Sequence, residues 1–148
     1  MSVSLMPGKI EVITGCMFSG KSTELLNRLQ HCSEKYLLVK PNIDTRYGLA
    51  NVSTHSGTKE SATVINSLAD VFQKLNGIKV LGIDEAQFFS IRIINDCEKL
   101  KKLGLRIVIA GLNKDYLNKE FKSVTGLIKI ADSTTNLYAI CNRCSAPA

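Results

Sequence analysis

The chain has 148 residues and a formal net charge of +6, with 45% hydrophobic and 22% charged residues. This length and this mix predict one globular unit with a buried core and exclude a largely disordered chain. The basic surplus favours an anionic partner such as a nucleotide. The lysines and arginines are spread along the chain, so we expect no dedicated nucleic-acid surface.

No stretch approaches the roughly 18 apolar residues of a membrane span. The first eight residues also lack the pattern of a signal peptide. We therefore expect no membrane partner and a cytoplasmic location. In that compartment the five cysteines are more readily thiols or metal ligands than disulfides.

Short apolar segments alternate with segments of helical periodicity along the chain. The pattern predicts strands at residues 9–14, 36–40, 61–65, 80–83, 105–110 and 136–140, and helices at 22–32, 67–75 and 91–103. Ser67 and Asp70 resemble a capping box, and Gly104 ends the third helix. Near-continuous apolar strands separated by helices are typical of a parallel sheet covered on both faces. The sequence therefore predicts an α/β fold.

A phosphate-binding loop is predicted directly after the first strand. The segment matches the pattern G-x-x-x-x-G-K-[ST], and its residues are Gly15, Cys16, Met17, Phe18, Ser19, Gly20, Lys21 and Ser22. Glycines let the backbone N–H groups turn toward phosphate oxygens, and the following helix adds its positive N-terminal dipole. Lys21 is expected to contact the terminal phosphates of ATP, and the Ser22 hydroxyl is expected to bind Mg²⁺.

Two carboxylates follow the strand predicted at residues 80–83. In a P-loop protein an aspartate at the end of such a strand holds Mg²⁺ or a water in its shell, which assigns the metal to Asp84. The second carboxylate, Glu85, is then placed to accept a proton from the attacking nucleophile. These two residues leave open whether that nucleophile is water or a substrate hydroxyl.

Several blocks resemble the cytosolic-type (type II) thymidine kinases and occur in the family's order. They are Met17 to Leu25, Asp44-Thr45-Arg46-Tyr47, Thr54-His55-Ser56-Gly57, Asp84-Glu85-Ala86-Gln87-Phe88-Phe89 and Ala110-Gly111-Leu112-Asn113. The resemblance spans about residues 9–144 and implies a P-loop NTPase-like parallel sheet flanked by helices.

The resemblance implies transfer of the γ-phosphate of ATP to the 5′-hydroxyl of thymidine, or of deoxyuridine, for nucleoside salvage. It makes Glu85 the proton acceptor and places Gln87 in the nucleotide-site block with Asp84. Arg46 would add positive charge near the transferred phosphate. The thymine pocket would be lined by Met17, Phe88, Leu112, Tyr116 and Phe121. A homotetramer is also implied.

A C-x₂-C pair, Cys141 and Cys144, lies close to the C-terminal end of the sequence. Two thiolates at this spacing can fill two corners of a zinc tetrahedron, but a structural site needs four ligands. The family pattern has a second pair, which this sequence does not contain, and two free thiols are the alternative. We expect a C-terminally truncated member with a P-loop kinase domain at 1–135 and an incomplete zinc-ribbon or lid region at 136–148.

Two other functions fit the same residues. One is an inactive nucleotide-binding remnant. The resemblance implies a lid over thymidine that follows Cys144, and this sequence does not contain it. The other is a P-loop ATPase in which Glu85 activates water. A basic stripe interleaved with aromatic residues would favour an ATPase that acts on nucleic acid, and the sequence shows no such stripe.

Overall fold

The structure, a computed structural model, describes residues 8–16, 19–42, 51–53, 59–115 and 117–137. In chain order the elements are β1 (Lys9–Gly15), α1 (Lys21–His31), β2 (Tyr36–Pro41), β3 (Asn51–Ser53), β4 (Lys59–Ser61), β5 (Thr63–Ile65), η1 (Leu68–Lys74), β6 (Val80–Ile83), η2 (Ala86–Phe88), α2 (Arg92–Lys102), β7 (Arg106–Ala110), α3 (Lys122–Ile130) and β8 (Ser133–Leu137), where η marks a 3-10 helix.

Six strands form one parallel sheet in the order β5-β2-β6-β7-β1-β8, and β3 pairs with β4 in a separate antiparallel ribbon. The first strand of the chain thus lies between two strands that come late in the sequence. In the register, Ile13 lies opposite Ala110 on one side and Thr135 on the other. The predicted α/β fold with a parallel sheet is confirmed.

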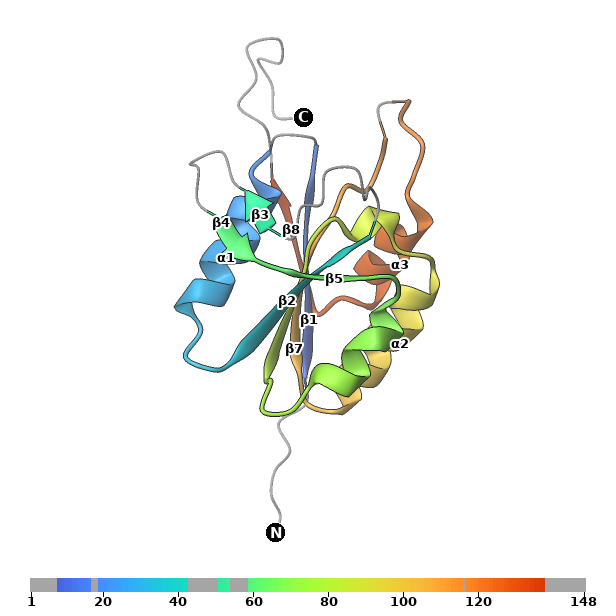
Figure 1. Ribbon diagram of the computed structural model, residues 1–148. Helices are drawn as coiled ribbons and strands as arrows, with labels where there is room; N and C mark the ends of the chain where they lie inside the picture. The colour runs from blue at the N-terminus through green and yellow to red at the C-terminus, as the bar shows by residue number, and fades with distance from the viewer. Residues whose placement is uncertain (1–7, 17–18, 43–50, 54–58, 116, 138–148) are drawn as a thin grey trace.

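Helices cover both faces of this sheet, with α1 on one side and α2 and α3 on the other (Figure 1). The strands serve both faces by alternation: Val12 packs in the cluster under α2 and α3, and Ile13 packs in the cluster under α1. On α1, Leu25, Leu26 and Leu29 are buried at helical spacing against the sheet. This burial fixes the helix that begins at the phosphate loop.

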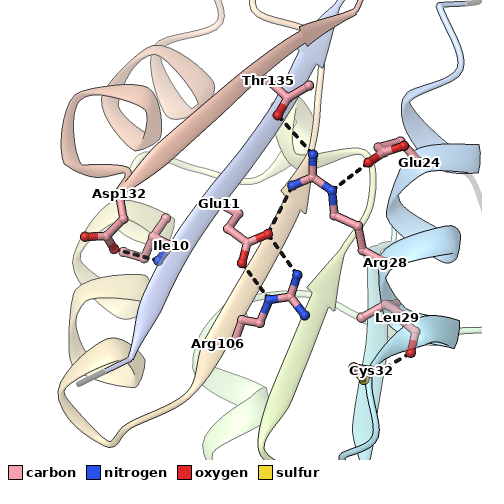
Figure 2. A network of polar contacts seen from close by, with 9 residues as sticks. All are labelled: Ile10, Glu11, Glu24, Arg28, Leu29, Cys32, Arg106, Asp132 and Thr135. Atoms are coloured by element: carbon pink, nitrogen blue, oxygen red, sulfur yellow. Dashed lines mark hydrogen bonds and ion pairs between the residues drawn. The ribbon is translucent and has the colours of Figure 1, made fainter. Parts of the chain in front are cut away.

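A polar network also holds α1 to the sheet (Figure 2). The carboxylate of Glu11 on β1 accepts hydrogen bonds from Arg28 of α1 and from Arg106 of β7. Arg28 donates further hydrogen bonds to Glu24 and to the hydroxyl of Thr135 on β8. Burial opposes ionisation of Glu11, but the hydrogen bonds and charges of the two arginines outweigh it and lower the pKa of that carboxyl. Glu11 and Arg28 thereby join one helix and three strands.

Among the described residues, α3, the β3–β4 ribbon and the start of β8 differ from the sequence prediction. The sequence pattern did not predict α3, because Val124, Thr125 and Gly126 weaken its helical signal. It did not predict the β3–β4 ribbon, and β8 begins at Ser133, before the predicted start at residue 136. The strand β8 is rich in Ser, Thr and Asn and lies at the edge of the sheet, where a strand needs few apolar residues.

Candidate active site

The phosphate loop connects the end of β1 to the start of α1, as its motif predicts. Gly15 has φ 151°, and a Cβ atom there would lie 2.4 Å from the Leu137 carbonyl oxygen and 2.8 Å from the Ser19 hydroxyl. Gly20, at the N-terminal boundary of α1, has φ 91°. Side chains other than hydrogen are strained at both positions, so the two motif glycines are required by backbone geometry.

Lys21 lies over this loop at the first position of α1. Its Nζ donates to the Cys16 carbonyl oxygen at 2.8 Å and to the Ser19 hydroxyl at 3.4 Å. Burial lowers the pKa of Lys21, although the nearby charges of Glu85 and Asp84 act in the opposite direction. The lysine therefore provides a partly desolvated positive charge where phosphate oxygens are expected.

Ser22 and Asp84 meet although 62 residues separate them in the sequence. The Ser22 Oγ donates to the Asp84 carboxylate, 3.1 Å from Oδ1 and 3.0 Å from Oδ2. Asp84 is 5% exposed, and burial, together with the charge of Glu85, raises its pKa to about 6. A hydroxyl and a carboxylate side by side form an oxygen donor set of the kind that Mg²⁺ prefers. These two residues fit the magnesium role that the sequence predicts for them.

Glu85 follows Asp84 in a left-handed conformation, with φ 53° and ψ 43°. A glutamate in this region is uncommon and is held there by its surroundings. Its N–H donates to the Asp84 Oδ1 at 3.0 Å, and its Oε1 accepts a hydrogen bond from the Gln87 Nε2 at 3.1 Å. The hydrogen bond from the Glu85 backbone to the Asp84 side chain therefore holds the two acidic residues together at the carboxyl end of β6.

An aromatic pair lies beyond these carboxylates. Phe88 is 51% exposed, and its ring centroid lies 6.5 Å from that of Phe121 in an edge-to-face arrangement. Phe89, by contrast, is 7% exposed and belongs to the core. The Leu112 N–H donates to the Gln87 Oε1 at 3.0 Å, which brings the end of β7 to the same place. The structure therefore gathers Phe88, Phe121 and Leu112 near Glu85, and an exposed aromatic face suits a flat base.

The segment between β7 and α3 is organised by Asp115. Its Oδ1 accepts the N–H groups of Leu117 and Lys119, and its own N–H donates to the Lys119 carbonyl oxygen. The end of the segment is fixed by the Phe121 N–H, which donates to Asn113 at 2.9 Å. The sequence pattern did not predict this turn, although an Asp followed by Asn is a usual signal for a turn.

Six predicted site residues lie outside the described residues: Met17, Phe18, Arg46, Tyr116, Cys141 and Cys144. Within the described ranges, no group of three or more His, Cys, Asp or Glu side chains could hold a metal ion. No helix in the described part of the chain is long and apolar enough to cross a membrane. Zinc therefore remains an expectation from the sequence.

Comparison with known proteins shows the family to which the chain belongs. The family described as thymidine kinase matches residues 8–148. A thymidine kinase of Bacteroides fragilis is 41% identical over 140 residues, which is 93% of this chain and 70% of the relative. Thymidine kinases of Mesoplasma florum and of Roseiflexus sp. are 37% and 36% identical and are covered over 72% and 78% of their lengths. The chain belongs to the thymidine kinase family, a family of phosphotransferases.

Proposed function

We propose that this chain transfers the γ-phosphoryl group of ATP to the 5′-hydroxyl of thymidine, with deoxyuridine as a second acceptor. The observation that carries the proposal is the pair of hydrogen bonds between Ser22 and Asp84. They join the phosphate loop to the end of β6, where Glu85 is the next residue. A phosphate site and a proton acceptor are thus adjacent.

In the proposed reaction the 5′-oxygen of the nucleoside forms a bond to the γ-phosphorus, and the bond from that phosphorus to the β,γ-bridging oxygen breaks. The hydroxyl proton moves to the Glu85 carboxylate, and ADP leaves. The Oε2 of Glu85 has no hydrogen-bond partner among the described residues, whereas Oε1 is engaged by Gln87. One carboxylate oxygen is therefore free to accept that proton.

The other residues orient the phosphates and stabilise charge. Lys21 provides a positive charge beside the loop, and Arg46 has the same role by family resemblance. Ser22 and Asp84 would hold Mg²⁺, which when bound neutralises charge on the phosphate oxygens. Phe88 and Phe121 offer an aromatic surface for the base.

The test is thymidine monophosphate formation by the purified 148-residue chain with Mg-ATP, measured by chromatography. Glu85→Gln keeps the size of the side chain and removes the proton acceptor, so kcat is expected to fall by about 100-fold or more. Glu98→Gln makes the same change at an exposed position of α2 and is expected to keep the wild-type rate.

Equal rates in Glu85→Gln and wild type would overturn the assignment of Glu85 as base. ATP binding by the wild type without thymidine monophosphate formation would favour an inactive nucleotide-binding protein. Hydrolysis of ATP at the same rate with and without thymidine would favour an ATPase.

A further inference from the structure

Gln87 is a buried amide whose two ends are both used inside the protein. It is 6% exposed and lies in η2, the single 3-10 turn that follows the two carboxylates. Its Nε2 donates to the Glu85 Oε1 at 3.1 Å, and its Oε1 accepts from the Leu112 N–H at 3.0 Å. The side chain therefore bridges the end of β6 and the segment after β7.

The orientation of this amide follows from the chemistry of its neighbours. A backbone N–H can only donate, so the atom that faces Leu112 has to be the amide oxygen. The NH₂ group is consequently directed at Glu85, whose ionised carboxylate can only accept. A hydrogen bond to an ionised group is stronger than one between neutral groups, so Gln87 favours one position of the Glu85 carboxylate.

The surroundings hold the amide itself in place. A Cβ atom at Gly111 would lie 3.3 Å from the Gln87 Oε1 and 3.1 Å from the Ala86 Cβ, so Gly111 allows the close approach. Behind the turn, the Ser123 hydroxyl donates to the Ala86 carbonyl oxygen at 3.4 Å. The turn that carries Gln87 is therefore bonded to α3, which restricts its movement.

We infer that Gln87 is a positioning residue that holds the Glu85 carboxylate for proton transfer and fixes it relative to Leu112. The surroundings hold Glu85 in a left-handed backbone conformation, and Gln87 is the residue that bonds to its side-chain carboxylate. Gln87 acts through Glu85 and does not need to contact the nucleotide. This inference rests on the proposed function, because it assigns a role to the base of that reaction.

The kinetic test uses Gln87→Met, which keeps the length of the side chain and removes both hydrogen bonds. Misplacing a catalytic group lowers the rate by up to about 100-fold, and we expect kcat to fall about 10- to 100-fold while the KM for ATP stays unchanged. In the Glu85→Gln background the same change should lower kcat less than about 2-fold, because the group that Gln87 positions has already been removed.

The donor and acceptor halves are separated by Gln87→Glu, which still accepts from the Leu112 N–H but places a carboxyl group against Glu85. Loss of kcat similar to that of Gln87→Met assigns the effect to the donor half. Ser67→Ala, which removes the side-chain cap of η1 away from this turn, is expected to lower thermal stability and to leave the kcat of the folded enzyme unchanged.

A purely structural role predicts equal losses from Gln87→Met in the two backgrounds, and that result would overturn the inference. A measurement independent of turnover is NMR of the Gln87 side-chain amide, assigned by its disappearance in Gln87→Met. Its proton facing Glu85 should shift upfield in Glu85→Ala. A wild-type chain without kinase activity would contradict the proposed function alone, and an unchanged amide signal would contradict the inference alone.

Discussion

Asp84 is a carboxylate with little access to water, and its nearest charged neighbour in the sequence is another acid, Glu85. The hydrogen bonds from Ser22 and from the Glu85 N–H only partly compensate for this burial. Its pKa is raised from 3.8 to about 6. Between these two pH values the folded protein therefore keeps a proton that the unfolded chain has lost. The residue suited to bind a cation thus destabilises the metal-free fold at neutral pH.

Asp84→Asn is therefore expected to stabilise the metal-free protein at about pH 8. The contribution of Asp84 to stability is fully present below about pH 4 and is lost as the pH rises through about 6. A shift of this size corresponds to about 3 kcal/mol in the free energy of unfolding, and the advantage of Asn should vanish near pH 4. Denaturant unfolding in the presence of a chelator measures it, and parallel pH profiles for the two proteins would refute the prediction.

Thr14 is a second buried polar residue, and its hydroxyl has no hydrogen-bond partner in the described part of the chain that compensates for its burial. It lies at the end of β1, is 3% exposed, and its Oγ1 has no hydrogen-bond partner among the described residues. Leaving a buried hydroxyl without a partner costs about 1 kcal/mol or more.

Thr14→Val keeps the shape of the side chain and is expected to raise the free energy of unfolding by about 1 kcal/mol. Thr135→Val is the matched control, because the Thr135 hydroxyl accepts from Arg28 at 2.9 Å and its removal should lower stability. Thermal unfolding of both variants gives the two signs. A destabilised Thr14→Val would mean that this hydroxyl is bonded to an ordered water.

At the scale of elements, α1 is held by its leucines and by the Glu11 network. Glu11 joins β1 to Arg28 of α1 and to Arg106 of β7, and its side chain is 13% exposed. Removing the Glu11 carboxylate takes an acceptor from both Arg106 and Arg28, although Arg28 keeps its hydrogen bonds to Glu24 and Thr135. The predicted phosphate loop lies between β1 and α1, so this network joins the two elements that flank the loop.

Glu11→Gln is expected to lower the free energy of unfolding by about 2 kcal/mol at neutral pH. The pKa of Glu11 is lowered from 4.5, so its contribution is present above about pH 4.5 and is lost as the pH falls through the folded-state value. The difference between variant and wild type should therefore shrink in acid. Denaturant unfolding measures it, with Glu98→Gln as the exposed control, and a constant difference would show that the arginines do not stabilise the ionised form.

The sequence predicted most elements because their patterns are local. The strand at residues 80–83 is fully buried and reads as an uninterrupted apolar run, and the capping box of Ser67 and Asp70 is present. The sequence pattern did not predict α3, because packing and not propensity stabilises this helix. A Cβ atom at Gly126 would lie 2.1 Å from the Ile94 Cδ1, so α2 and α3 approach closely at this glycine. Such a contact between α2 and α3 leaves no signal in a local window.

At the candidate site, too, local sequence patterns predict residue types but not the features that depend on tertiary contacts. Motifs predicted Lys21, Ser22, Asp84 and Glu85 as candidate site residues, because phosphate and metal chemistry needs those residue types at those spacings. No motif could give the left-handed conformation of Glu85 or the direction of the Gln87 amide. The direction of the Gln87 amide depends on the Leu112 N–H, which the pairing of β6 with β7 brings close.

For the whole molecule, the strand order places the candidate site residues together at the carboxyl ends of neighbouring strands. The strands β1, β6 and β7 are parallel neighbours, so the segments that follow them, with Gly15, Asp84 and Leu112, emerge on the same side. In open α/β sheets ligands bind outside the carboxyl ends of the strands. The site is therefore a product of the topology as much as of the motifs.

The position of β1 between β7 and β8 also has a consequence for synthesis on the ribosome. The strand that carries the phosphate loop is made first, yet its partners are residues 106–110 and 133–137. Contacts between segments so distant in the sequence form slowly. A nascent chain that has reached only residue 130 has one of these partners and lacks the other, so the proposed phosphate site is completed late in synthesis, once β8 has paired with β1.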